Sequence, residues 1–390
     1  MTDNSPDLET VTLDGAAAGF DGDEPVDQAG DVEVEEEGER EAPEPVRFNV
    51  SSYGWDSDVE GLVKRLDRND VYTPGFQRGF VWSNPEKSRF IESLILGLPV
   101  PTIFLAQDGD SKRLNIVDGQ QRLRTLQQYL GGGFALSGKD IQPDLAGRYY
   151  SSEVARSSRS KVLVDADARQ LADSIIHAVV IKPDPGDNDA TRGHEYNRAI
   201  IQIFQRLNTS GRPLQHQEIR ASIFHGPFDD MLREMNGGEN WRALFGPVHS
   251  RMKDMEAILR FVALLEEGDD YRGPMPRFLD DFMETNREVG AERSAELTAL
   301  FQAAIALCRE ARGDNAFKRA GTFLLSHFDA VMAGVSRAIR SGAALDAAIV
   351  EERWSVLDSD AEFQWATSEF VNDTLRVKKR LERATAIFAG

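Results

Sequence analysis

One stretch of this 390-residue chain, Leu114–Leu130, restricts the possible folds strongly because its apolar period changes partway along. Residues 114–117 read Leu-Asn-Ile-Val, a short and partly β-branched run that is typical of a strand. Beyond Gly119 the apolar residues recur at helical spacing, at Leu123, Leu126 and Leu130. The sequence therefore predicts a strand that passes into a helix at Asp118–Arg122.

This predicted turn carries five polar or permissive residues: Asp118, Gly119, Gln120, Gln121 and Arg122. Free backbone N–H groups and the positive end of the helix dipole favour an anion at the start of a helix. Glycine lets the backbone approach a ligand, glutamine amides donate and accept, and a guanidinium forks onto phosphate or carboxylate oxygens. Because a carboxylate beside such donors needs a cation or a proton to transfer, the set indicates phosphate with a metal or with an attacking water. The alternative, an N-cap at Asp118 and a solvated Arg122, stays open.

Most of the negative charge lies near the N-terminus. The net charge is −20, and residues 1–45 hold 16 acidic residues and one basic residue, Arg40, which leaves −5 for the rest of the chain. These residues are rich in Gly, Ala and Pro, with Phe20 as their one aromatic residue, so they cannot bury enough apolar surface to offset chain entropy. We expect a disordered acidic tail over residues 1–46. A solubilising role, nucleic-acid mimicry over a basic groove and docking on a basic partner are the alternatives.

The remaining composition predicts a soluble protein of the cytoplasm that does not enter a membrane. The one cysteine, Cys308, excludes an internal disulfide framework and a Cys-rich zinc module, and it favours a reducing compartment. The N-terminus lacks the basic and apolar regions of a signal peptide, and no apolar run approaches membrane-spanning length.

Two other segments repeat the chemistry of the central turn. Upstream, Gln77 and Arg78 lie in an aromatic segment that Pro and Gly interrupt, Val71–Trp82. Downstream, Arg206 and Asn208 lie where one helical stripe ends in a polar loop before the next helix. Ordinary helix capping explains Asn208 equally well, and a loop arginine is usually solvated.

The other patterns predict secondary structure rather than chemistry. Ser57 and Glu60 have the spacing of a capping box, and a second helix is expected to start at Ser83–Glu86. Strands are expected over 103–106 and 175–181, and almost every segment from Phe228 onward is helical in pattern. There is no Walker motif, no G-x-G-x-x-G, no G-x-S-x-G and no H-E-x-x-H, so the sequence offers no familiar nucleophile or zinc site.

Three separated pieces, taken in order, carry a family resemblance. They are Phe76-Gln77-Arg78 with Trp82, the run Asp118-Gly119-Gln120-Gln121-Arg122, and Phe204–Gly211 followed by Leu214 and Glu218. Together they resemble the N-terminal domain of GmrSD-type modification-dependent restriction endonucleases, a prokaryotic family related to the ParB/sulfiredoxin-like fold. The resemblance covers about residues 50–235. It implies an α+β chain, with a ParB/sulfiredoxin-like mixed α/β nucleotide-binding domain over residues 47–235 and an all-helical region over 236–390.

The resemblance also implies a function and roles for individual residues. The family implies binding and hydrolysis of a nucleoside triphosphate in defence against phage DNA that carries modified bases or backbones. Carried over, Asp118, Gln121 and Arg122 are catalytic, with Asp118 binding magnesium or another divalent cation, or aligning the attacking water that Gln121 helps to orient. The implied nucleotide- and phosphate-binding residues are Gln77, Arg78, Gly119, Gln120, Arg206 and Asn208, and Arg122 also holds phosphate.

The sequence departs from the family in one respect that bears on partners. Single-chain members carry a C-terminal nuclease of the His-Asn-His (HNH) type, whereas His249 and His327 are the only histidines after His225 in this chain. We therefore expect a stand-alone sensor and nucleotidase subunit whose HNH nuclease is a separate polypeptide, with DNA as a further partner. Assembly into a homo-oligomer stays open.

Two readings from other functional classes remain. One is a non-hydrolysing DNA-binding module of ParB type, in which the same Arg and Gln side chains grip a DNA backbone. The other is a protein-interaction scaffold that uses the helical C-terminal half. The central motif lacks the cysteine of a sulfiredoxin, which excludes redox repair.

Overall fold

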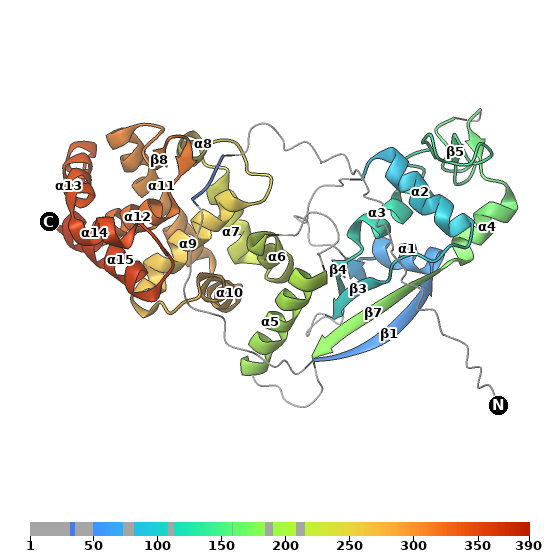
Figure 1. The fold of residues 1–390 in the computed structure, drawn as a ribbon, viewed down its shortest axis with the longest axis horizontal. Coiled ribbons are helices and arrows are strands. Elements are labelled where there is room, and N and C mark those ends of the chain that lie inside the picture. Colours follow the sequence, from blue (N-terminus) through green and yellow to red (C-terminus); the bar gives the residue numbers. More distant parts are fainter. Residues whose placement is uncertain are drawn as a thin grey trace, which may run out of the picture.

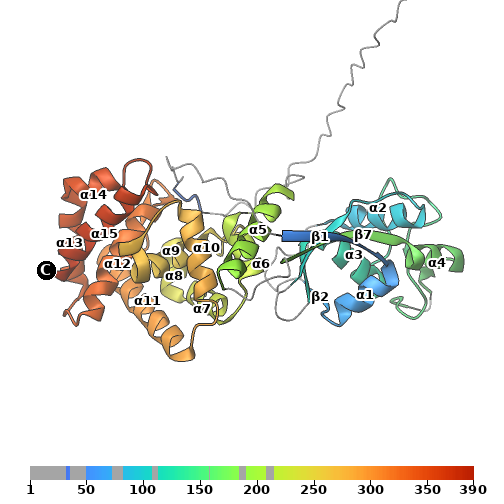
Figure 2. The same ribbon diagram turned by 90° about the horizontal axis from the view of Figure 1, so that it is seen from below.

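The computed structural model describes residues 32–35, 50–72, 82–107, 113–157, 159–183, 190–207 and 215–390. A region built around a sheet and a larger helical region lie next to each other along the long axis of the molecule (Figure 1). Helices α5 (Ala190–Leu207) and α6 (His216–Ile223) lie between the two, as the view from below also shows (Figure 2). This arrangement confirms the predicted α+β class.

The sheet that positions the central turn has the strand order β1-β7-β3-β4-β2 within the described residues. Its strands are β1 (Val50–Asp58), β2 (Val71–Tyr72), β3 (Ile103–Gln107), β4 (Leu114–Asp118) and β7 (Ile175–Pro183). Strand β7 pairs antiparallel with β1 and parallel with β3, and β4 pairs antiparallel with β3 and parallel with β2. The register between β3 and β4 shifts at Phe104, which pairs with Asp118, so a β-bulge lies at the end of the sheet where the turn begins.

Side chains on the central strands alternate between two cores, as a pleated sheet requires. Leu105, Ile116 and Val180 are buried in a core with the four helices of the sheet region. The next residue in each of these strands belongs to the core of the helical region instead; these residues are Ala106, Val117 and Ile181. Both faces of the sheet are therefore covered, and the second face is where α5 packs against β4 and β7.

Two of the four helices of the sheet region begin at polar caps. The four helices are α1 (Val59–Asp67), α2 (Asn84–Ile95), α3 (Gln120–Leu130) and α4 (Asp165–Asp173). Helix α2 starts as expected at Ser83–Glu86, and these two residues form a capping box. The capping box expected at Ser57 and Glu60 is not formed; α1 is capped instead by Asp58, which accepts from the Gly61 N–H. A small parallel pair of strands, β5 (Arg148–Tyr149) and β6 (Lys161–Val162), lies between α3 and α4 in the sequence.

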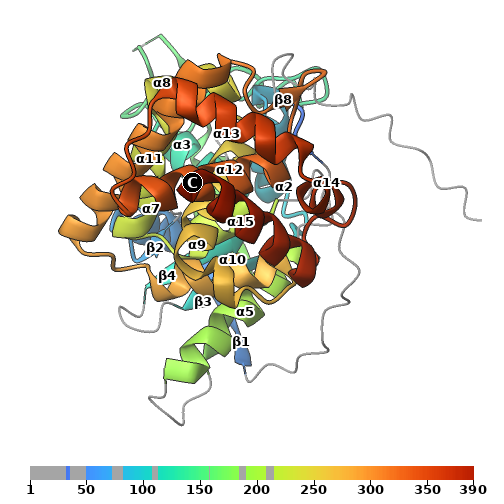
Figure 3. The ribbon, with the colours of Figure 1, turned by 90° about the vertical axis from the view of Figure 1, so that its left-hand side faces the viewer.

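The helical region, which faces the viewer in Figure 3, packs around one large core. Its helices are α7 (Pro227–Asn236), α8 (Glu239–Phe245), α9 (Lys253–Glu267), η1 (Gly268–Asp270), α10 (Met275–Thr285), α11 (Ala291–Arg312), α12 (Leu325–Arg340), α13 (Ala347–Ser359), α14 (Ala361–Ala366) and α15 (Thr374–Ala389). Cys308 is buried in α11, as expected of a packing residue, and desolvation raises the pKa of its thiol. None of the helices that the structure describes is both long and apolar enough to cross a bilayer.

A hairpin interrupts this region, where the sequence predicted only helices. Strands β8 (Lys318–Arg319) and β9 (Thr322–Phe323) are joined by Ala320 and Gly321, which both have positive φ. Residues 32–35 of the predicted disordered tail lie along β9: the Glu35 N–H donates to the Phe323 carbonyl and the Phe323 N–H to the Glu33 carbonyl. Most of the acidic tail lies outside the described residues.

Candidate functional site

The backbone at the centre of the site requires a glycine. Strand β4 ends at Asp118 and helix α3 begins at Gln120, so the backbone passes from strand to helix at Gly119, which has φ 100° and ψ 9°. A Cβ atom on Gly119 would lie 2.5 Å from Cγ2 of Ile103 on β3. The left-handed conformation and this close approach both exclude a side chain, so the turn depends on glycine for its shape.

The carboxylate of the turn forms an ion pair with the arginine one helical turn later. Arg122 Nη2 lies 2.6 Å from Asp118 Oδ2, and the side chains are 11% and 32% exposed respectively. Nη1 of the same guanidinium donates to the carbonyls of Pro101 and Thr102, the latter at 3.2 Å. Among the described residues Asp118 Oδ1 has no hydrogen-bond partner, so the pair holds the carboxylate by one oxygen and leaves the other available.

Hydrogen-bond donors follow this carboxylate in sequence at the start of α3. Within the described residues, no side chain caps the first N–H groups of the helix. The Gln120 side chain is half-buried, and its Nε2 atom is buried without a partner in the described part of the chain. Gln121 accepts a 3.3 Å hydrogen bond on Oε1 from the backbone N–H of Trp82. Unsatisfied donors at a helix N-terminus form a surface suited to an anion.

The structure brings Trp82 of the upstream motif segment to this turn, through the hydrogen bond from its backbone N–H to Gln121. Near the start of β4, Asn115 donates from Nδ2 to the Ser222 carbonyl of α6 at 3.0 Å. Arg206 is exposed in the last turn of α5, the helix that packs against β4. Gln77, Arg78 and Asn208 lie outside the described residues, so their predicted contacts stay predictions.

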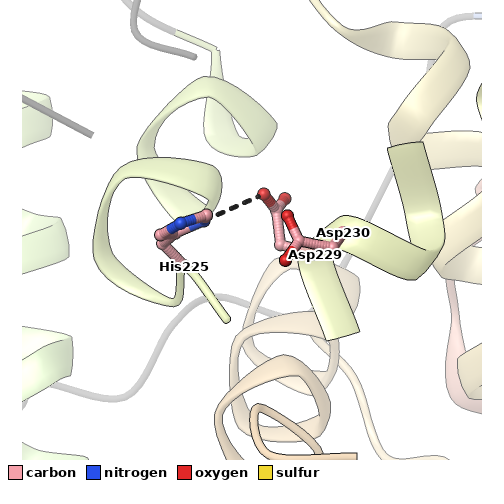
Figure 4. A group of neighbouring side chains, drawn as sticks. All are labelled: His225, Asp229 and Asp230. Carbon is pink, nitrogen blue, oxygen red and sulfur yellow. Dashed lines mark ion pairs between the residues drawn. The ribbon is translucent and has the colours of Figure 1, made fainter. Parts of the chain in front are cut away.

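A second group of potential metal ligands escaped the sequence analysis. The nearest ligand atoms of His225, Asp229 and Asp230 lie within 4.8 Å of one another around the first turn of α7 (Figure 4). Their signal in the sequence is the i, i+4 spacing of His225 and Asp229, whose Nδ1 and Oδ2 atoms are 3.5 Å apart.

Existing ion pairs already account for this group. Arg233 Nε donates to Asp229 Oδ2 at 2.9 Å, and Asp229 is fully buried. Burial raises the pKa of the Asp229 carboxyl, and the charge and hydrogen bond of Arg233 oppose that shift. Asp229 Oδ1 is buried and has no hydrogen-bond partner within the described residues, but a fully buried carboxylate is closed to a hydrated divalent cation, so we interpret the group as an ion-pair network at the start of α7.

Comparison with known proteins identifies one match. Residues 59–225 match the family model described as GmrSD restriction endonuclease, N-terminal domain. The matched range includes the turn at Asp118–Arg122 and ends at His225, just after α6. No curated protein and no solved structure matches the chain.

Proposed function

We propose, on the premise that residues 59–225 belong to the GmrSD restriction endonuclease N-terminal domain family, that this chain binds and hydrolyses a nucleoside triphosphate at the β4–α3 turn. The family indicates a component of a restriction system that acts against phage. Within such a system the chain is a sensor subunit, and hydrolysis reports that its target DNA has been bound.

The observation that supports this proposal most is that Arg122 binds only one of the two carboxylate oxygens of Asp118. Arg122 fixes Oδ2 while Oδ1 faces no partner in the described structure. A carboxylate that is held in one orientation and keeps an accessible oxygen is suited to bind a cation. We therefore assign Arg122 to positioning Asp118, in addition to the phosphate contact that the sequence suggested.

The residues present fit a magnesium ion. Mg²⁺ in nucleotide sites is commonly bound through one or two carboxylates and the phosphates of the substrate. Asp118 supplies one held carboxylate with an open oxygen, 32% exposed as a side chain, and it is the residue that would hold the ion. When bound, Mg²⁺ neutralises charge that develops on the phosphate oxygens.

The donors around the turn suit the phosphates themselves. The first N–H groups of α3 and the buried Nε2 of Gln120 supply neutral donors, and Arg206 supplies a cation from α5. We propose that Arg78, four residues before Trp82 in the sequence, adds a second cation. We propose that Gln77 and Asn208 complete this phosphate-binding set.

We assign Gln121 to the attacking water. Its amide is oriented by the Trp82 N–H, and its backbone carbonyl accepts from Thr125 Oγ1 at 2.7 Å, which fixes the first turn of α3. An amide held in one plane orients a water at low entropic cost, because little side-chain freedom is lost on binding.

The partners follow from what the chain offers. We propose that DNA of the invading phage stimulates hydrolysis and that a separate HNH nuclease cleaves it, because residues 236–390 have two histidines, His249 and His327, and lack a His-Asn-His arrangement.

Phosphate release from each nucleoside triphosphate, with and without DNA, tests the proposal. Magnesium-dependent release by the full chain that rises with DNA supports it. A DNA gel shift without release under any condition would favour the non-hydrolysing, ParB-type alternative instead.

A further inference from the structure

The outer face of α3 carries no negative charge. The helix contains two arginines, four glutamines and no aspartate or glutamate, in a chain whose net charge is −20. Its apolar side is buried, since Leu123, Leu126 and Tyr129 lie in the core of the sheet region. The exposed face of a helix in a soluble protein usually carries charges of both signs. A face that holds only cations and amides is instead suited to a polyanion.

Arg124 is the cation on this outer face. Residues two apart on an α-helix are turned by about 200°, so Arg124 points away from Arg122, which reaches back to the carbonyls of residues 101–102. Burial lowers the pKa of the Arg124 side chain, and no carboxylate opposes the shift. Arg124 forms no hydrogen bond or ion pair with the residues that the structure describes. It also lies in the middle of α3, so it does not serve as a counter-charge to the negative end of the helix dipole.

Lys87 of α2 adds a second cation beside the same face. Its Nζ donates to Gln128 Oε1 at 3.2 Å. Gln128 follows Arg124 by four residues, so the two residues are neighbours along one ridge of α3. The Lys87 ammonium lies 5.2 Å from the centre of the Phe134 ring, and burial lowers its pKa. Lys87 and Arg124 therefore lie on either side of Gln128.

Arg156, from the segment between β5 and β6, brings a third cation to the same place. Its Nη2 donates to the Gly133 carbonyl at 3.3 Å. The Gly133 N–H donates to the Gln128 carbonyl at 2.7 Å, and a Cβ atom on Gly133 would lie 3.4 Å from the Gln128 Cβ. Arg156 is exposed and forms no ion pair within the described ranges, even with Glu153 one turn earlier. Figure 1 shows α2, α3 and the segment that holds β5 gathered at one end of the sheet region.

This arrangement favours an extended polyanion over a small anion. The three cations come from separate elements, Arg156 is exposed and the other two are half-buried, so they form an open surface. Duplex DNA presents about one negative charge per 1.7 Å of its axis, which lets several cations of one surface bind at the same time. The Gln128 amide adds a neutral donor of the kind that contacts phosphate oxygens beside basic side chains.

From these observations we infer that Lys87, Arg124 and Arg156 form a surface, the basic face, that binds the phosphate backbone of duplex DNA. The inference rests on the proposed function in one respect, that DNA is a partner of this chain, and it adds the surface that contacts the DNA. Because backbone contacts carry no sequence information, the basic face supplies affinity rather than specificity. It lies on the side of α3 that is turned away from Arg122.

Titration of an unmodified duplex of about 30 base pairs, followed by fluorescence anisotropy at several salt concentrations, tests the inference on the full chain. The variant Lys87→Gln/Arg124→Gln/Arg156→Gln removes the charges and keeps a polar side chain with good helix propensity. We expect DNA affinity to fall by about ten-fold or more at low salt. The slope of log K against log salt should become shallower by about 2–3, because each lost phosphate contact removes about 0.9. The loss should be the same for duplexes of different sequence.

The three single variants give the same test independently of the triple variant. Each should make the salt slope shallower by about one, so the inference stays testable even if the triple variant does not fold. Unchanged affinity and slope in all these variants would overturn the inference.

A matched charge control separates the basic face from net charge. Arg272→Gln/Arg319→Gln/Lys378→Gln removes three positive charges from the helical region and should bind the duplex as the wild type does. An equal loss in this control, no binding of the duplex by the wild type, or equally tight binding of polyglutamate would each overturn the assignment to DNA. Phosphate release by the wild type without DNA is measured in parallel. Its absence would contradict the proposed hydrolysis, whereas DNA binding that depends on the three cations would still support the basic face.

Discussion

Arg122 Nη2 and Asp118 Oδ2 lie 2.6 Å apart across the first turn of α3, and the arginine is nearly buried. Because the same guanidinium also binds the carbonyls of Pro101 and Thr102, it ties the end of β4 to the segment that leads into β3. The orientation of the Asp118 carboxylate is thus built into the sheet before any ligand arrives, which is the preorganisation that a hydrolytic site requires.

Arg122→Lys separates positioning from phosphate binding. A lysine keeps the charge but cannot contact both Asp118 and the two carbonyls in the geometry of the guanidinium fork. If Arg122 acts mainly by holding Asp118, kcat for triphosphate hydrolysis falls by about ten-fold or more while KM changes little. A rise in KM at unchanged kcat would instead assign Arg122 to phosphate binding alone.

Gly119→Ala should distort the turn. The added Cβ would lie 2.5 Å from Ile103 Cγ2 at a residue with φ 100°, so we expect a loss of about 1–3 kcal/mol in the free energy of unfolding. Chemical denaturation measures this loss. Gly54→Ala in β1 is the matched control, since its Cβ meets no atom within 4 Å. Equal stability of the two variants would contradict the strained geometry.

The helical region holds a buried charge cluster that makes a clear stability prediction. Asp329 Oδ2 pairs with Arg260 at 2.6 Å and with Arg380 at 2.9 Å, and all three side chains are fully buried. Asp329→Asn would leave two buried guanidinium groups without a counter-charge, at a cost of about 3–5 kcal/mol in a urea titration.

Its control is Asp269→Asn, which removes an ion pair with Arg337 from the surface. Asp269 is 82% exposed, so this change should cost at most about 1 kcal/mol. If the two variants lose similar stability, the buried cluster does not contribute in the way that its geometry indicates.

The contact between residues 32–35 and β9 predicts that the backbone amide of Phe323 is protected from hydrogen exchange. Val34 is buried in the core of the helical region, and the Phe323 N–H donates to the Glu33 carbonyl at 2.8 Å. Val34→Asp should detach residues 32–35 and speed exchange at the Phe323 amide. The Leu324 amide donates to Phe317 instead and serves as the internal control. Unchanged exchange at Phe323 would show that the segment does not pair in solution.

The sequence predicts the elements whose signals are local. The strand and helix on either side of Asp118 follow from the apolar period, and the start of α2 at Ser83–Glu86 follows from local signals at the first turn of that helix. The partner of Asp118 is close in sequence, since Arg122 follows it by four residues across the turn at Gly119. Arg122 also donates to two backbone carbonyls, because residues 101–102 lie close to its guanidinium. No sequence pattern indicates this proximity.

Features that depend on distant contacts were missed. The β8–β9 hairpin has short strands around Ala320 and Gly321, and neither its apolar pattern nor its turn is strong enough to stand out from the helices on either side. Residues 32–35 become ordered by pairing with β9 some 290 residues later and by burying Val34.

Phosphate release by wild type, Asp118→Ala and Asp140→Ala, each measured with magnesium and DNA alongside nucleotide affinity, tests the central claim most directly. Asp140 is an exposed aspartate of the same region that pairs with Arg89 away from the turn. The account predicts that Asp118→Ala abolishes release while retaining part of the nucleotide affinity, and that Asp140→Ala behaves as wild type. Release at the wild-type rate by Asp118→Ala would contradict it.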